Sequence, residues 1–481
     1  MERYFFDISD IVHFISRESH FSGIQRATVM MIDRAAENIT DAEVFVSFFD
    51  PQKNKYQAIP FSEIGVGILT NAQSLRSLLK IKGKTKETIS PLLRNYIDTP
   101  VKLWYHTMRL NFQSRLGNDK FFSRRNTTLQ EWRSTQSGFQ DKSRRLETLD
   151  FNNKARKGDS LVLLDASWTL PPVLGVFCQA RERGIHIHCM IHDLIPIVAP
   201  EYFTGNSPIE FHNWLIGTSK FTSRYIANSA STANDLAIFL KSYGIEIPIE
   251  TVPLAQACLP KSNLADQAAL ARSNLRNDVY KKLYLGSFVS DEVRSLSRSP
   301  FVLCVGTMEV RKNIWKIAQV WDRLRMTPNI QLPKLVFAGR AGWLKQDFDN
   351  FMRATGNLYG WVEIAENPSD DELAYLYNNC LFTITASCYE GWGLPIGESL
   401  SYGKTAVVSN VSSMPEVGGN LVEYCDPMSI DSIFAACSKL IADPVHRSKL
   451  EKSIAASKLR SWDDVATDLR NVLRKETSGK V

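Results

Sequence analysis

The feature of this sequence that most restricts its fold is an alternation of short apolar runs with stretches of helical periodicity, which begins near residue 300. Short apolar runs are typical of strands buried on both faces, and helical stretches between them are typical of βαβ units. The expected strands are residues 301–306, 334–339, 381–386 and 405–409. The alternation therefore predicts a parallel sheet whose strands are connected by helices.

Residues at the expected helix ends support this pattern. Asn313 is a residue type that caps helices, and the positions after it repeat apolar residues at helical spacing. Ser369 and Glu372 have the spacing of a capping box. Pro395 suits the first position of a short helix, and a last helix is expected at residues 461–474.

The N-terminal half shows the same alternation less regularly. Because 481 residues are too many for one compact core, we expect two domains. The pattern breaks off over residues 70–160, and the polar stretch 261–298 is expected to hold the linker. The expected strands of this half are residues 3–6, 44–49, 161–164, 186–191 and 225–227.

The cysteines and the N-terminus bear on the cellular compartment. The eight cysteines lie singly, without the CxxC or Cys/His spacing of a zinc site, as expected for free thiols in a reducing compartment. The first residues lack the basic and apolar regions of a signal peptide. No apolar run approaches the roughly 18 residues of a membrane span. We therefore expect a cytoplasmic protein.

Two loops in the C-terminal half follow expected strands, so both are expected at the carboxyl edge of one sheet, where such sheets bind ligands. The first loop, residues 306–313, places Arg311 and Lys312 directly before a helix N-terminus. Two cations beside the positive end of a helix dipole indicate a site for an anion such as a phosphate.

The second loop contains Gly391 and Gly393, and Pro395 follows at a helix start. The glycines are expected to permit positive φ and a close approach of backbone amides to a ligand. Two carboxylates, Glu390 and Glu398, lie on either side of the glycines. Carboxylates would repel a phosphate but can accept hydrogen bonds from the hydroxyls of a sugar and a ribose. The two loops together predict a site for a nucleotide sugar.

This arrangement resembles a known family. The spacing of Glu390 and Glu398 in a Glu-Gly-aromatic-Gly-Leu-Pro-x-x-Glu context is similar to the signature of retaining family 4 glycosyltransferases, and residues 306–313 resemble their donor-phosphate loop. Further stretches that resemble the family, or its branch of bacterial surface-polysaccharide mannosyltransferases, are residues 415–418, 422–427, 22–26, 192–196 and 228–232.

The resemblance implies the GT-B fold, an α/β architecture of two facing Rossmann-like domains. It implies an acceptor domain at residues 1–295 with a basic insertion at about 70–160, and a nucleotide-sugar domain at 296–455. Residues 456–481 would form a helix that crosses back to the first domain.

The resemblance also implies roles for residues of the second domain. Lys312 and Arg311 would bind the donor diphosphate. Glu398 would hold the ribose, and Glu390 the transferred sugar. The residues whose backbone would contact sugar and phosphate are Gly391, Trp392, Gly393 and Leu394.

In the first domain, Gly23 would lie against the reaction centre and His192 would hydrogen-bond the donor sugar. His192, Lys312 and Glu390 are the residues expected to act in catalysis.

Structural readings of the same residues stay open at this point. Glu390 could be a solvated loop residue, and Glu398 an acid that complements a helix dipole. Arg311 could pair with Glu309 or Asp322. His192, at the end of an expected strand, could be a core histidine.

The expected function is a retaining, metal-independent glycosyltransferase. The expected donor is GDP-mannose or a related GDP-sugar. The expected acceptor is a growing bacterial surface glycan such as O-antigen or capsule, either as a glycan or as a lipid-linked glycan. The alternatives are a UDP-sugar-dependent glycosyltransferase and a non-catalytic subunit of glycan assembly. An epimerase would turn over donor without acceptor, and a phosphorylase would need a pyridoxal lysine site that the sequence does not show. A dehydrogenase is disfavoured because no GxGxxG follows an expected strand.

Charge is concentrated in one segment. Residues 81–160 contain 17 Lys/Arg and 8 Asp/Glu, a net charge of +9 in a chain whose total is +6. Aromatic residues lie among the cations, which suits the headgroup layer of an anionic membrane. We therefore expect peripheral binding at the inner face of the cell membrane, weakened by charge reversal at Lys120, Arg124, Arg125 and Arg133. A solvated insertion is the alternative, and no nucleic-acid motif accompanies the charge.

Overall fold

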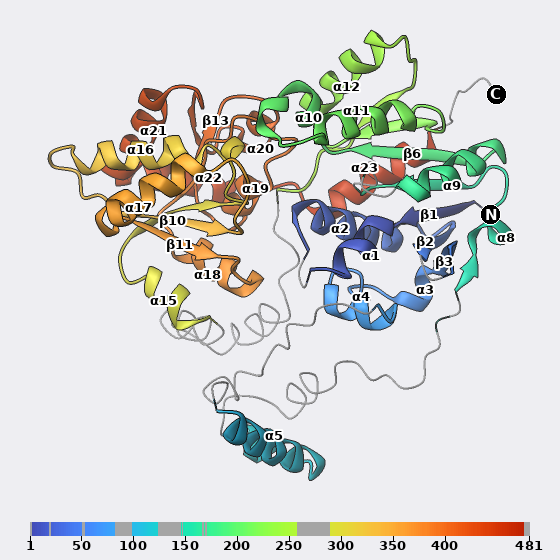
Figure 1. Cartoon of the computed structure of the whole chain (residues 1–481), viewed down its shortest axis with the longest axis horizontal. Coiled ribbons are helices and arrows are strands. Elements are labelled where there is room, and N and C mark those ends of the chain that lie inside the picture. Colours follow the sequence, from blue (N-terminus) through green and yellow to red (C-terminus); the bar gives the residue numbers. More distant parts are fainter. Residues whose placement is uncertain are drawn as a thin grey trace.

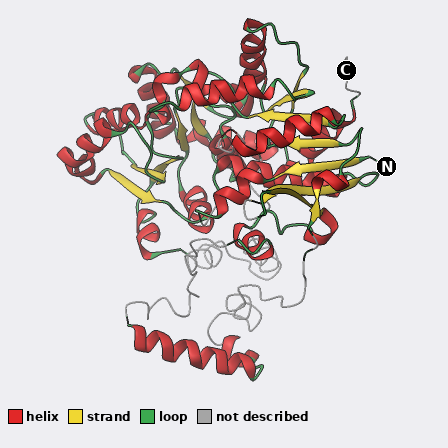
Figure 2. Ribbon diagram, turned by 45° about the vertical axis from the view of Figure 1, so that its right-hand side comes forward, coloured by secondary structure: helices red, strands yellow, loops and turns green. Residues whose placement is uncertain are grey.

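The structure of the chain is a computed structural model that describes residues 2–18, 21–50, 53–81, 99–123, 146, 148–165, 168, 171–256 and 289–475. It shows two α/β domains side by side, each with a central sheet and helices packed around it (Figures 1 and 2). Arg124, Arg125 and Arg133 of the basic segment lie outside the described residues.

The first domain contains an eight-stranded sheet of order β4-β3-β2-β1-β5-β6-β7-β8. The neighbouring strands β2, β1, β5, β6, β7 and β8 pair in parallel. Strands β3 and β4 extend the sheet beyond β2 by antiparallel pairing. The strands are β1 (Arg3–Asp7), β2 (Glu43–Asp50), β3 (Lys55–Pro60), β4 (Leu149–Asp150), β5 (Ser160–Leu163), β6 (His186–Ile191), β7 (Arg224–Ala227) and β8 (Ile249–Thr251).

Helices of this half lie on both faces of the sheet, whereas α5 stands apart (Figure 1). They are α1 (Ser9–Ile15), α2 (Gly23–Asn38), α3 (Phe61–Ile64), α4 (Ala72–Leu78), α5 (Pro100–Arg115), α6 (Asp119–Ser123), α8 (Phe151–Lys154), α9 (Pro171–Glu182), α10 (Ile195–Val198), the 3₁₀ helix η3 (Pro200–Tyr202), α11 (Ser207–Thr218) and α12 (Ala230–Ser242).

The second domain contains a parallel six-stranded sheet of order β11-β10-β9-β12-β13-β14. This is the strand order of the Rossmann fold, in which ligands bind where the order reverses, here between β9 and β12. The strands are β9 (Phe301–Val305), β10 (Lys334–Gly339), β11 (Val362–Glu366), β12 (Thr383–Thr385), β13 (Ala406–Ser409) and β14 (Glu423–Cys425).

Helices cover both faces of the second sheet (Figure 2). They are α15 (Asp291–Leu296), η4 (Val310–Lys312), α16 (Ile314–Arg325), α17 (Gln346–Gly360), α18 (Asp370–Asn379), α19 (Leu394–Ser401), α20 (Met414–Gly418), α21 (Ile430–Ala442) and α22 (Pro444–Ala456). One more helix, α23 (Trp462–Arg474), follows α22 and lies outside this domain. The capping box of Ser369 and Glu372 is present at the start of α18.

The predicted strands are all present, within a few residues of their expected bounds. The sequence analysis missed β3, β4, β8, β11 and β14. Strand β3, Lys-Tyr-Gln-Ala-Ile-Pro, mixes polar and apolar residues without alternation, yet Tyr56 to Ile59 are buried. Pairing with β2, rather than a hydrophobic pattern, places this segment in the sheet.

The second domain begins before the expected boundary at residue 296. Val289, Val293 and Leu296 are buried in one cluster with Phe301 and Leu303 of β9, so α15 packs on the second sheet. Residues 257–288, which include most of the expected linker, lie outside the described residues.

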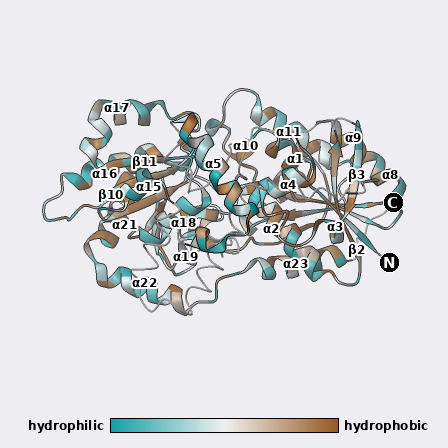
Figure 3. Cartoon of the chain, turned by 90° about the horizontal axis from the view of Figure 1, so that it is seen from below, coloured by the Kyte–Doolittle hydropathy of each residue, from teal (hydrophilic) through white to brown (hydrophobic). Residues whose placement is uncertain are grey.

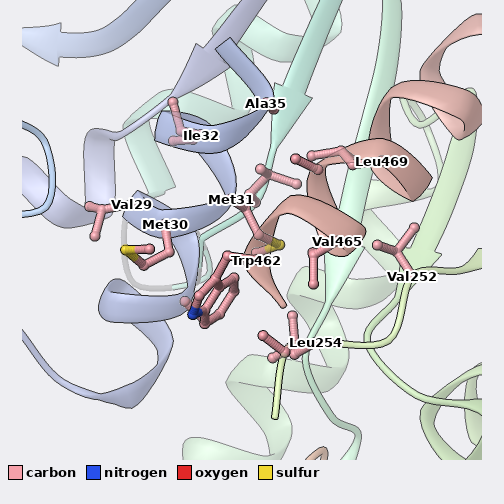
Figure 4. Close-up of a cluster of buried hydrophobic side chains, with 14 of the residues drawn as sticks. Val29, Met30, Met31, Ile32, Ala35, Val252, Leu254, Trp462, Val465 and Leu469 are labelled. Atoms are coloured by element: carbon pink, nitrogen blue, oxygen red, sulfur yellow. The ribbon is translucent and has the colours of Figure 1, made fainter. Parts of the chain in front are cut away.

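The last helix, α23, returns to the first domain and packs along α2 (Figure 4). Trp462, Val465 and Leu469 of α23 are buried in the same cluster as Met30 and Met31 of α2. Ser461 begins α23 through a capping box with Asp464. The end of the chain thereby ties the second domain to the first.

We expect Leu469→Ala to lower the free energy of unfolding by about 2–5 kcal/mol, because the side chain is fully buried and its removal leaves a cavity. The measurement is the urea-unfolding midpoint followed by fluorescence. Val445→Ala, at an 80% exposed position of α22, is the control and is expected to change stability by less than about 0.5 kcal/mol. Equal midpoints for the two variants would contradict the packing of α23.

Candidate functional site

The loop after β9 brings two cations to the point where the strand order reverses. Gly306 has a φ of 142°, and a Cβ there would lie 3.3 Å from Cε of Lys312. Asn313 has a left-handed φ of 61° at the start of α16. Its side chain does not cap the helix, contrary to our expectation: Nδ2 donates to the carbonyls of Ala386, at 3.0 Å, and Pro427, at 2.8 Å. Asn313 thus ties the loop after β9 to the loop after β12.

A buried carboxylate joins the two loops. Nζ of Lys312 lies 2.5 Å from Oε1 of Glu390, and Nη1 of Arg311 lies 2.9 Å from Oε2. Burial would raise the pKa of Glu390, but the charges of Arg311 and Lys312 outweigh it and lower the pKa to about 2. Glu390 is therefore ionised at neutral pH and is not a solvated loop residue.

Arg311 makes a second ion pair, which the sequence analysis had left open. Its Nη2 lies 2.6 Å from Oε1 of Glu309. Asp322, the other partner considered, pairs instead with Arg325. Burial raises the pKa of Glu309, and the adjacent cations oppose that rise. The positive charges of Arg311 and Lys312 are therefore balanced to a large extent by the carboxylates of Glu309 and Glu390.

Gly391 and Gly393 are required to be glycine for different structural reasons. Gly393 has a φ of 95° at the start of α19, a conformation that favours glycine. Gly391 does not have a positive φ, contrary to our expectation; a Cβ there would lie 2.0 Å from the carbonyl oxygen of His192 in the first domain. Gly391 is therefore needed because the backbones of the two domains touch at this point.

The residues after Gly391 also contact the first domain. Trp392 is buried, and its Nε1 donates to the carbonyl oxygen of Ala255 at 3.3 Å. Gly23 starts α2, and a Cβ there would lie 3.5 Å from Cδ1 of Leu394. The structure thus brings the expected first-domain residue Gly23 to the start of α19.

Glu398, in α19, has partners from both domains. Its Oε2 accepts a hydrogen bond of 2.7 Å from the hydroxyl of Tyr377 in α18. Its Oε1 lies 3.6 Å from Nη2 of Arg26, which α2 of the first domain supplies. Arg26 was not among the expected site residues, because the sequence equally suited it to a plain helix start; its position beside Gly23 in the 22–26 motif was the available signal.

His192 follows β6 and faces the second domain through its backbone. Its Nε2 lies 2.8 Å from the carbonyl oxygen of Leu164. A carbonyl only accepts hydrogen bonds, so Nε2 carries the proton and Nδ1 is the acceptor nitrogen. Burial lowers the pKa of His192, against smaller opposing effects of Leu164 and Asp10, so the ring is neutral at pH 7.

A second carboxylate crosses between the domains at the start of α12. The side chain of Glu416 accepts hydrogen bonds from the amides of Ala230, at 2.8 Å, and Ser231, at 2.9 Å. An anion is stabilised at a helix N-terminus by the free amides and the helix dipole. Nearby, the hydroxyl of Tyr389 donates to Asp235. The sequence analysis had singled out residues 228–232 and 415–418 as motifs, but it did not predict that they contact each other.

Two further carboxyls, missed by the sequence analysis, lie where the strand order of the first sheet reverses. Asp7 ends β1 and Asp165 follows β5, and both are buried. Burial raises the pKa of Asp7 to about 6, although hydroxyls of Ser9 and Tyr56 donate to it. Burial, and then the charge of Asp7, raise the pKa of Asp165. Two such neighbours retain a proton more readily than isolated carboxylates do.

No group of three or more His, Cys, Asp or Glu side chains that could hold a metal ion occurs within the described ranges. Asp349 of the Asp347-x-Asp349 sequence lies in α17, where Nζ of Lys345 pairs with it at 2.6 Å. None of the helices that the structure describes is long and apolar enough to cross a membrane.

Residues 289–457 match the family described as "Glycosyl transferases group 1". The matched range contains the whole six-stranded sheet and both loops at its switch point. The second domain is a group 1 glycosyltransferase domain.

Curated relatives of this glycosyltransferase domain and its surroundings include bacterial mannosyltransferases. The chain is 34% identical over 175 residues to O-antigen chain mannosyltransferase B of Escherichia coli, a match that covers 36% of this chain and 45% of that protein. It is 24% identical over 287 residues to the serotype-specific mannosyltransferase WbdA of Escherichia coli, covering 58% of this chain and 32% of that protein. The matches thus span less than half the length of these relatives.

Solved structures extend the similarity of the glycosyltransferase domain to the whole fold. Anabaena Alr3699/HepE in complex with UDP-glucose has a TM-score of 0.53 at 12% identity and covers 98% of this chain and 99% of its own. The sucrose-phosphate synthase of Thermosynechococcus elongatus has a TM-score of 0.51 at 14% identity, with 99% of each chain covered. The two-domain architecture is therefore the GT-B fold of glycosyltransferases, as the resemblance implied.

We expect Gly391→Ala to open the contact between the glycosyltransferase domain and the first domain. The added methyl group would lie 2.0 Å from a backbone oxygen, which no side-chain rotation can relieve. Small-angle X-ray scattering should show a larger radius of gyration with unchanged circular dichroism. Gly217→Ala is the control, since a Cβ there meets nothing within 4 Å. Superimposable scattering curves for Gly391→Ala and the parent would refute this contact.

Proposed function

We propose that the chain is a retaining glycosyltransferase that moves a hexose from a nucleotide sugar to a growing bacterial surface glycan. The observation that carries this proposal is the meeting of Lys312, Arg311 and Glu390 between β9 and β12. The family of the second domain and the mannosyltransferases among the relatives support it.

The proposed donor site works by exchange of partners. The donor diphosphate would take the place of Glu390 as the partner of Lys312 and Arg311. Glu390 would then accept hydrogen bonds from hydroxyls of the transferred sugar. As the sugar leaves, negative charge builds on the diphosphate, and cations already held in position stabilise that charge without reorganisation.

The same exchange is proposed at the ribose. Glu398 would accept hydrogen bonds from the ribose hydroxyls, in place of the guanidinium of Arg26 that now lies 3.6 Å away. Gly23 would lie against the sugar because it already faces Leu394 at the start of α19. Nδ1 of His192 would accept a hydrogen bond from the sugar, since Nε2 is engaged by Leu164.

The proposed donor is GDP-mannose or a related GDP-sugar, in line with the mannosyltransferases among the relatives. A UDP-sugar is the second candidate, because a protein of the same fold, Anabaena Alr3699/HepE, has been solved with UDP-glucose. A non-catalytic assembly subunit is less well supported, since Lys312, Glu390 and Glu398 occur together in one site.

A thermal-shift screen of GDP, UDP, ADP and their sugars tests the donor. We expect GDP-sugars to stabilise the fold by about 2.7 kcal/mol at a hundredfold excess over the dissociation constant. Lys312→Ala is expected to reduce transfer by about 10²–10³-fold, the usual effect of losing one donor to a developing anion. Lys334→Ala, on β10, is the control because Lys334 forms an ion pair with Glu363 and lies outside the proposed site. Near-normal transfer by a folded Lys312→Ala protein would remove the basis of the proposal.

The stereochemistry gives an independent test. Retaining glycosidases place a nucleophilic carboxylate about 5 Å from an acid partner. Glu390 and Glu398 are both assigned to hydroxyls here, so we expect attack by the acceptor on the same face, assisted by the leaving phosphate. NMR of the product should show a retained anomeric configuration, and activity should persist in EDTA. An inverted product, or complete loss of activity in EDTA, would contradict this mechanism.

A further inference from the structure

Helix α5 exposes its apolar side chains instead of burying them. It stands clear of both domains in two different views (Figures 1 and 2). Seen from below, it lies in front of the region where the domains meet, with hydrophobic and hydrophilic residues along its length (Figure 3). The exposed large apolar residues of this helix and its C-terminal cap are Val101, Trp104, Tyr105, Met108, Phe112 and Leu116, between 53% and 78% exposed.

These six residues form one continuous stripe. They follow one another at intervals of one, three or four residues, and at 100° per residue they cover an arc of about 120°. Leu110 and Ser114, on the opposite side of the helix, are buried. The apolar stripe of α5 therefore faces outward, whereas a helix on the surface of a soluble domain normally turns its apolar stripe toward the core.

The cations of the helix lie along one edge of the stripe and at its C-terminal end. Pro100–Arg115 contains no Asp or Glu, and its cations Lys102, Arg109 and Arg115 are all exposed. The guanidinium of Arg109 lies over the ring of Phe121, 5.7 Å from its centre. The basic segment around the helix, residues 81–160, has a net charge of +9. A partner for this stripe must therefore be apolar at its centre and negatively charged at its edge.

We propose that the stripe of α5 docks on an anionic lipid membrane. An outward apolar arc with Trp, Tyr and Phe, flanked by Lys and Arg, is the composition of helices that lie in the headgroup layer. Each basic residue near such a surface strengthens binding by about 1 kcal/mol, or roughly fivefold. A second copy of the chain fits less well, because pairing two stripes would bring cations of the same sign together without an acidic partner.

Flotation with vesicles tests this proposal on the full chain. We expect binding to phosphatidylcholine vesicles that contain roughly one third phosphatidylglycerol, weak binding to phosphatidylcholine alone, and release by salt. Trp104→Glu with Phe112→Glu should abolish the binding. Ile238→Glu with Val445→Glu is the matched control, since these residues are also exposed but lie in α12 and α22.

A second pair of variants tests the cations of the helix. Lys102→Gln with Arg115→Gln should weaken binding about fivefold per residue and reduce its dependence on salt. Arg109 is kept because it also contacts Phe121.

Donor binding, measured by thermal shift, should stay unchanged in all of these variants. Membrane docking and the proposed transfer reaction can therefore fail separately.

Three results would overturn the proposal. The first is a parent protein that does not float with anionic vesicles at low salt, or a stripe variant that floats as well as the parent. The second is a change from dimer to monomer in the stripe variant by light scattering, which would assign the stripe to a second copy. The third is a loss of thermal stability in the stripe variant but not in its control, which would show that the rest of the chain covers the stripe.

Discussion

Glu390, buried between Lys312 and Arg311, is the interaction on which the site of this protein depends. Removing a carboxylate from water is costly unless cations and hydrogen bonds replace the lost hydration. Here two cations from the loop after β9 do so for a residue of the loop after β12, and Asn313 links the same two loops. The ionic contact therefore fixes the switch point of the Rossmann sheet before any ligand arrives.

The second constraint is the close contact between the domains around this point. Gly391 leaves no space for a side chain against the backbone of His192, and Glu416 accepts from the first amides of α12. Helix α23 adds an apolar contact on α2, far from the loops in sequence. Because these contacts surround the switch point, residues of the first domain such as Arg26 and Gly23 reach α19. A site assembled in this way needs both domains.

Much of this arrangement could be predicted from local patterns in the sequence. Apolar runs predicted four strands of the second sheet, β9, β10, β12 and β13, because a parallel strand that is buried on both faces is mostly apolar. The capping box at Ser369 was predicted, because such caps depend on residues only three apart. The last helix was expected to start at Ser461, where the structure has a second capping box. By contrast, β3 and β8 are strands because they pair with β2 and β7, and no local pattern of apolar residues predicts them.

The sequence by itself determined the fold class, the two loops and the residue types of the site, because these follow from short-range periodicity and spacing. Only the tertiary structure decided which residues form the polar contacts of the site. Glu390 pairs with Arg311 and Lys312, Arg26 pairs with Glu398, and Glu416 accepts hydrogen bonds at the start of α12. The tertiary structure also decided why Gly391 is a glycine and that the side chain of Asn313 joins two loops instead of capping α16. The physical reason is distance along the chain, since contacts between residues tens to hundreds of positions apart depend on how the domains pack, which no local pattern encodes.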